Sequence, residues 1–97
     1  MVKTFKNKGT EDVFYGRSTK EARKECPTVL WKVASRKLDQ TDSVTSLIDL
    51  SVPPKNMLEA LKHDRLDQYS IRINNQYRIC FKWADSGPDE VEIVDYH

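Results

Sequence analysis

The stretch that decides the fold reads YSIRINNQYRICFKW and runs from Tyr69 to Trp83. Apolar and polar residues alternate along both halves of it, which is typical of β-strands that bury one face. Asn74 and Asn75 interrupt the alternation and favour a tight turn. The residues predicted on the buried face are Tyr69, Ile71, Ile73, Tyr77, Ile79, Phe81 and Trp83. The stretch therefore predicts an antiparallel hairpin with one apolar and one polar face.

The first half of the chain carries helical signals instead. Thr10 is the expected cap of a short first helix, and Ser18 opens a capping-box pattern for a second. Pro27 suits the first turn of the main helix, whose apolar positions continue at helical spacing to Leu38. The residues from Asp39 onwards are expected to end that helix.

The order of these elements indicates the fold class. After the hairpin, a second turn is expected at Asp85–Asp89, and a last strand at Val91, Ile93 and Val94. Helices followed by an antiparallel meander predict an α+β fold, with N-terminal helices packed on one face of a small antiparallel sheet. Because 97 residues suffice for one core, we expect a single domain over residues 1–97.

Composition excludes several classes of protein. No apolar run approaches the ~20 residues that cross a bilayer, and we find no signal peptide, so we expect a cytoplasmic protein. Cys26 and Cys80 lie far apart and show no metal-ligand spacing. We therefore expect reduced thiols, no metal and no other cofactor. The net charge is only +1, yet residues 1–40 hold ten Lys and Arg against five acids, so local basic faces remain possible.

The polar face of the predicted hairpin is cationic. If the apolar side chains pack under the helices, Arg72, Arg78 and Lys82 share the opposite face, and Lys62 and Arg65 come just before the first strand. Such a cluster suits a phosphate-bearing ligand, which Arg can bind bidentately. Acidic residues of the last strand offer another interpretation, in which ordinary cross-strand ion pairs neutralise these cations. They are Glu90 and Glu92. Spacing alone leaves both open.

The last three residues, Asp95-Tyr96-His97, are chemically rich for the end of a strand. Asp95 and His97 share the parity of the apolar residues before them. An imidazole can move protons near neutral pH, and a tyrosine ring can stack on a base. The alternative is that these side chains are simply solvated at the edge of the core.

Four segments together closely resemble the HigB-type "killer" toxins of the RelE/ParE toxin superfamily. They are Leu58-Glu59-Ala60-Leu61-Lys62 with Asp64-Arg65, Tyr69-Ser70-Ile71-Arg72-Ile73-Asn74, Tyr77-Arg78-Ile79-Cys80-Phe81 and Val91-Glu92-Ile93-Val94-Asp95-Tyr96-His97. The resemblance covers nearly the whole chain and is most specific after Pro53.

This resemblance implies a ribosome-dependent endoribonuclease that cuts messenger RNA, uses the RNA 2′-hydroxyl as nucleophile and needs no cofactor. It implies that Arg78 braces the phosphate, that Lys62 lends charge, and that Asp95, Tyr96 and His97 handle protons. Arg65, Arg72 and Lys82 are the further RNA-binding candidates.

Two positions depart from the family pattern. Glu59 stands where some members carry a catalytic histidine, and a carboxylate can act as a base but not as the same cation. His63 stands where the family usually has glycine, which costs backbone freedom if φ is positive there.

The resemblance also implies partners: a HigA-like antitoxin with a helix-turn-helix domain, the ribosome and its mRNA, and operator DNA only through the antitoxin. Two other functions stay open. One is a toxin of the same fold that poisons DNA gyrase without cutting RNA, and the other is a non-toxic module that only binds the antitoxin.

Overall fold

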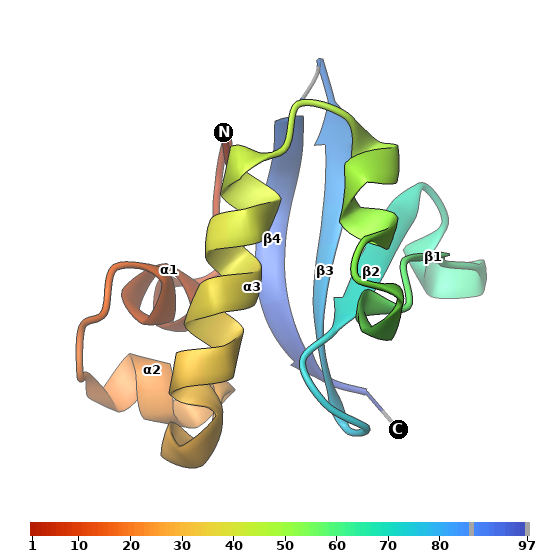
Figure 1. The fold of residues 1–97 in the computed structure, drawn as a ribbon. Helices are drawn as coiled ribbons and strands as arrows, with labels where there is room; N and C mark the ends of the chain where they lie inside the picture. The colour runs from red at the N-terminus through yellow and green to blue at the C-terminus, as the bar shows by residue number, and fades with distance from the viewer. Residues whose placement is uncertain (86, 97) are drawn as a thin grey trace.

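A four-stranded antiparallel sheet forms one layer of the molecule, in the order β1-β2-β3-β4. The computed structural model describes residues 1–85 and 87–96 (Figure 1). The strands are β1 (Glu59–Ala60), β2 (Gln68–Arg72), β3 (Tyr77–Ala84) and β4 (Gly87–Asp95). The helices are α1 (Lys8–Phe14), α2 (Lys20–Glu25) and α3 (Trp31–Ser43), with 3₁₀ turns η1 (Thr28–Leu30), η2 (Leu47–Ser51), η3 (Pro54–Asn56) and η4 (His63–Arg65).

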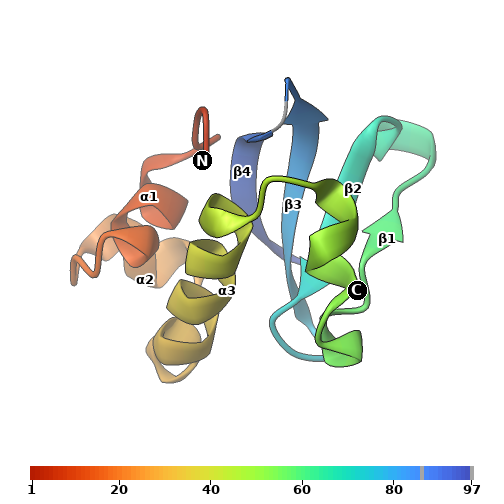
Figure 2. The ribbon, with the colours of Figure 1, turned by 45° about the horizontal axis from the view of Figure 1, so that its top comes forward.

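The strand register confirms the predicted faces of the sheet. Ile71 pairs with Ile79, and Ile79 pairs with Ile93, so these apolar side chains form one continuous row. They are buried together with Ala34 and Leu38 of α3. All three α-helices contact β4, and Figure 2 shows them gathered on one side of the sheet. The α+β prediction is therefore confirmed.

The helix ends differ from the prediction. The cap of α1 is Asn7, whose side chain accepts a hydrogen bond from the Thr10 N–H at 2.8 Å. Thr10 lies inside the helix, where its hydroxyl accepts the buried Ile93 N–H at 2.9 Å. The cap of α2 is Thr19 rather than Ser18. Helix α3 does not end near Asp39 but continues to Ser43.

The polar C-terminal turn of α3 stays helical because its side chains bond locally and to the next segment. The Thr41 hydroxyl donates to the Lys37 carbonyl at 2.8 Å, and the Gln40 amide donates to the Val52 carbonyl at 2.6 Å. The turn predicted at Asp85–Asp89 is shorter than expected, since β4 begins at Gly87. Ser86 lies outside the described residues.

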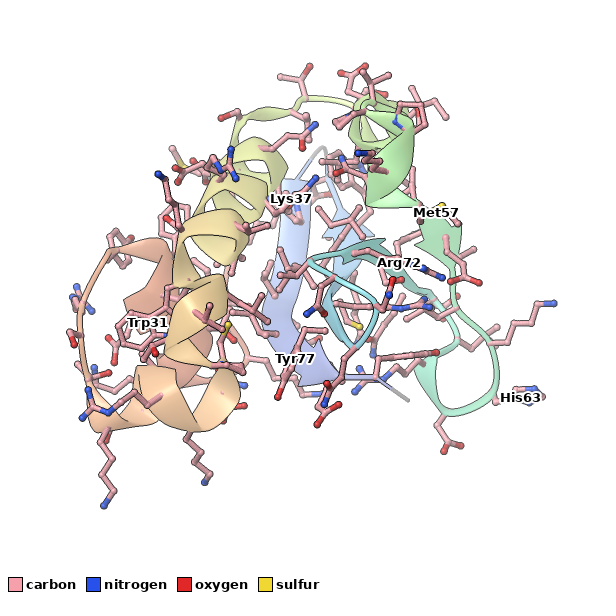
Figure 3. The ribbon with its side chains drawn as sticks, turned by 60° about the horizontal axis from the view of Figure 1, so that its bottom comes forward. Trp31, Lys37, Met57, His63, Arg72 and Tyr77 are labelled. Carbon is pink, nitrogen blue, oxygen red and sulfur yellow. The ribbon has the colours of Figure 1, made fainter. Side chains whose placement is uncertain are left out.

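Buried Asn56 fixes the segment between α3 and the sheet. Its Nδ2 donates to the Leu50 carbonyl at 3.0 Å and to Gln40 Oε1 at 3.1 Å, and its Oδ1 accepts from Lys37 Nζ. Figure 3 shows Lys37 on the side of α3 that faces this segment. The contacts hold η2 and η3 beside the sheet edge where β1 and β2 meet.

Candidate active site

The strand register brings the cationic side chains onto the face opposite the helices. In one row across the sheet, Glu59 lies beside Ser70 and Ser70 beside Cys80. In the next row, Arg72 lies beside Arg78. β1 pairs only with Tyr69 and Ser70, so β2 has no partner strand on that side at Ile71 and Arg72.

Arg78 is the best-held side chain of this face. Its Nη1 donates to Glu59 Oε1 at 2.6 Å and lies 3.4 Å from the Ser70 hydroxyl. The guanidinium carbon lies 4.4 Å from the centre of the Tyr96 ring, which is cation–π geometry. The Arg78 side chain is 14% exposed, whereas that of Glu59 is 55% exposed. Three of the predicted catalytic residues thus meet in one cluster, with the carboxylate on the solvent side.

An open pocket of about 510 Å³ adjoins this cluster at the sheet edge. Arg72, Arg78 and Glu59 line one part of it, and apolar side chains of the segment before β1 line another. These are Ile48, Pro54, Met57 and Leu58. Figure 3 shows Met57 and Arg72 beside each other and His63 at the far end of the next loop.

Two smaller hollows continue the pocket in both directions. One, of about 220 Å³, is lined by Lys62, His63 and Tyr96 and shares Glu59 with the pocket. The other, of about 340 Å³, is lined by Lys55 and Asn74 and shares Met57 and Arg72. The three hollows therefore follow one another along this edge of the sheet.

Two of the candidate RNA-binding cations form ion pairs. Arg65 Nη1 lies 3.4 Å from Glu92 Oε2, and Lys82 Nζ lies 2.9 Å from Glu90 Oε2. The hydrogen bond that Lys82 donates to Glu90 raises the pKa of Lys82. For Lys82 the interpretation as a cross-strand ion pair matches the geometry, whereas Arg65 pairs with β4 from the 3₁₀ turn η4. Arg72 differs, since it makes no ion pair within the described residues.

The register separates Asp95 from this cluster. Asp95 pairs with Tyr77, so it takes the parity of Tyr77 and not that of Arg78, and it accepts a hydrogen bond from Gln76 Nε2 at 3.1 Å. Burial, followed by the nearby Asp95 charge, raises the pKa of Tyr77. His97, the remaining candidate, lies outside the described residues.

Sequence reasoning missed two parts of the site. Ser70 contacts Arg78, and its position on the Arg72 face was the available signal. The apolar wall of Ile48 and Met57 had no periodic signal, because it comes from 3₁₀ turns and irregular chain.

Within residues 1–85 and 87–96, no three His, Cys, Asp or Glu side chains gather as a metal would require. No helix in that part of the chain is long and apolar enough to span a membrane.

Comparisons with known proteins identify the family. The family model described as "RelE-like toxin of type II toxin-antitoxin system HigB" matches residues 3–97. The chain belongs to the HigB-like toxin family. Toxin HigB-1 of Vibrio cholerae is 34% identical over 85 residues, which are 88% of this chain and 86% of that toxin. An uncharacterized protein of Haemophilus influenzae is 38% identical over 66 residues, which are 68% of this chain and 65%, just under two thirds, of that protein.

Solved structures of similar toxins share the fold of this HigB-like chain. A YoeB–YefM complex from Staphylococcus aureus matches with a TM-score of 0.60 and 21% identity, covering 100% of this chain and 95% of the other. A heterotetrameric YoeB–YefM toxin–antitoxin complex from the same organism matches with a TM-score of 0.57 and 20% identity, at the same coverage. The resemblance seen in the sequence is thus confirmed at the level of family and fold.

Proposed function

We propose that this HigB-like chain is a growth-inhibiting toxin that cuts messenger RNA on the translating ribosome. The observation that supports the chemistry is the clamped Arg78, held between the Glu59 carboxylate and the Tyr96 ring at the wall of an open pocket. A guanidinium fixed before the substrate arrives can stabilise charge on a phosphorane with little movement of its own. The aromatic ring and the open, partly cationic pocket suit single-stranded RNA.

The proposed reaction gives each candidate group of this cluster a role. The RNA 2′-oxygen attacks the neighbouring phosphorus, the bond from phosphorus to the 5′-oxygen breaks, and a 2′,3′-cyclic phosphate and a 5′-hydroxyl result. Glu59 accepts the 2′-hydroxyl proton, and Arg78 neutralises the developing charge. Tyr96 and His97 supply the proton to the leaving 5′-oxygen, and Lys62 adds positive charge from the neighbouring hollow. Asp95 has no step in this scheme.

The ion pair between Glu59 and Arg78 has a role in this scheme. An arriving phosphate is a second anion for the same guanidinium, so it competes with the Glu59 carboxylate for Arg78. Glu59 is 55% exposed and can move aside without losing a buried contact. Substrate binding then frees the carboxylate to act as the base.

Cleavage of a defined mRNA during translation in a purified system tests this proposal. We expect Arg78→Ala to lower the cleavage rate by about 10²–10³-fold, as the loss of a charge-stabilising donor does in other enzymes. Glu59→Gln should also lower it, because the amide cannot accept the proton. The matched control is Arg23→Ala, which removes an exposed cation from α2 and should cut normally. Circular dichroism and thermal unfolding verify that each variant folds.

Two results would contradict this proposal. One is intact mRNA on ribosomes in the presence of the wild-type chain. The other is growth arrest accompanied by gyrase-cleaved DNA, which would identify a gyrase poison of the same fold.

We also infer an antitoxin partner, since the matching family consists of toxins of type II toxin–antitoxin systems. The partner expected is a HigA-like protein with a helix-turn-helix domain, through which the pair would bind operator DNA. Co-expression of this chain with the product of the adjacent reading frame checks this. Growth arrest that persists, with no complex on purification, would contradict it.

A further inference from the structure

Two side chains of the apolar wall of the large pocket, Ile48 and Met57, are largely exposed to solvent. Ile48 is 67% exposed and Met57 is 51% exposed, although both line the same pocket. Single exposed apolar residues are ordinary, but an apolar wall facing charged groups across an open pocket is typical of a ligand site. The volume, about 510 Å³, falls within the usual range for such sites.

The opposite side of the pocket carries Arg72. β2 and β3 place three cations on this face, and within the described residues Arg78 and Lys82 pair with carboxylates while Arg72 does not. The Arg72 Nε is buried and lacks a hydrogen-bond partner there. Burying part of a guanidinium without an acceptor costs free energy, so the side chain is not explained by its internal contacts. Because Arg72 lines the pocket, a ligand there can supply acceptors for its remaining N–H groups.

We propose that this pocket binds one nucleotide of the RNA, with its base against Ile48 and Met57 and its phosphate on Arg72. The proposal rests on the nuclease function and adds a base-binding slot beside the reacting phosphate. A nucleotide fits both walls because its base has an apolar face and its phosphate is anionic. The adjoining hollows at Lys62 and at Lys55 leave room for the neighbouring nucleotides of one strand.

The wall is held in place, as a slot requires. Asn56 ties the segment to α3 through Lys37 and Gln40, directly before Met57. Met57 has a left-handed backbone, with φ 50° and ψ 52°. Because the preceding residue is pinned and the backbone turns sharply at Met57, the Met57 backbone is held beside the pocket. Its flexible thioether can adapt from there to contact a ring.

NMR of the free chain tests the slot directly. The chain contains two methionines, so ¹³C-methyl labelling gives one signal at the pocket, from Met57, and one internal control, from Met1. The probe is a 2′-O-methyl RNA hexamer, which cannot be cut because its 2′-oxygen is blocked. We expect the hexamer to shift the Met57 methyl upfield by ring current in a saturable way, while Met1 stays in place. The matched abasic hexamer should leave Met57 nearly unshifted.

Two substitutions separate the base from the phosphate. Asn tolerates the left-handed backbone, so Met57→Asn keeps the turn and removes the apolar contact. It should weaken hexamer binding by about tenfold with an unchanged salt dependence. Arg72→Gln should instead reduce the slope of log affinity against log salt by about 0.7, the value for one phosphate contact in single strands. Val29→Ser, at an exposed apolar residue of η1, is the control and should bind normally.

Other outcomes overturn the slot. Equal Met57 shifts with the normal and abasic hexamers would show that the pocket binds phosphate but no base. The absence of a Met57 shift at millimolar hexamer would contradict nucleotide binding in this pocket. A Met57 signal that responds only to the antitoxin would reassign the wall to a protein partner. The titration needs no cleavage, so it is independent of the ribosomal assay. If the hexamer shifts the Met57 signal but the chain leaves mRNA intact on ribosomes, the base-binding slot is supported and the nuclease function is contradicted.

Discussion

His63 occupies a backbone conformation that glycine adopts more easily, with φ 57°. The left-handed region costs a non-glycine residue about 1–2 kcal/mol, so glycine relieves this strain. The greater conformational entropy of glycine in the unfolded chain offsets part of the stabilisation. We therefore expect His63→Gly to raise the free energy of unfolding by about 0.5–1 kcal/mol, measured by urea denaturation. His63→Ala keeps the strained backbone and serves as the control. A His63→Gly chain no more stable than His63→Ala would contradict this account.

At the same scale, strand parity predicted part of the site and missed part. Alternation placed Arg72 and Arg78 on one face, and the structure confirms that placement. The contact between Glu59 and Arg78 was not predictable from spacing, because β1 has only two residues and carries no periodic signal. The family resemblance supplied Glu59 instead. Parity also set Asp95 apart from Arg78, although the resemblance grouped the two as catalytic.

Asp12 joins α1 to α2 and makes their junction sensitive to acid. Its buried carboxylate accepts from Thr19 Oγ1 at 2.7 Å, from Lys8 Nζ at 3.0 Å and from Arg17 Nη1 at 3.1 Å. The Thr19 hydrogen bond, with the two cations, lowers the pKa of Asp12 from 3.8 to about 2. Because the folded-state pKa is depressed, the ionised carboxylate stabilises the fold fully above about pH 4 and loses this effect as the pH falls toward 2.

Asp12→Asn should therefore lower stability at neutral pH, and the difference from the wild type should shrink as the pH falls from about 4 to about 2. Urea midpoints measured across this range give the comparison. Asp39→Asn, at an exposed carboxylate of α3, is the matched control. A difference between Asp12→Asn and the wild type that persists unchanged at the acid end would mean that shape, and not charge, holds the junction.

Helix existence was easier to predict than helix ends. Thr10 and Asn7 are both good capping residues, and the choice between them depends on β4. The Thr10 hydroxyl accepts a hydrogen bond from the Ile93 N–H of β4, so Asn7 caps the helix instead. The last turn of α3 is polar and reads as a break, but bonds such as that from Gln40 to the Val52 carbonyl hold it. Both errors come from contacts with distant segments, which local spacing does not report.

The two layers of the molecule share one core, so we expect them to unfold together. Cys26 is the C-cap of α2 in the helical layer and Cys80 lies in β3, and both are fully buried. Burial raises the pKa of each thiol to about 11. Since the thiolate is the reactive form, both should resist alkylation in the folded chain at neutral pH. Pulse labelling with N-ethylmaleimide at rising urea, read by mass spectrometry, should give coincident midpoints for the two thiols.

The physical reason for coincident midpoints is that α1, α2 and α3 all pack on β4, so the helices cannot leave without opening the core around Ile79 and Ile93. Labelling of Cys26 at clearly lower urea than Cys80 would show instead that the helical layer opens by itself. The Cys26→Ser and Cys80→Ser chains assign each signal and check that neither substitution moves the other midpoint.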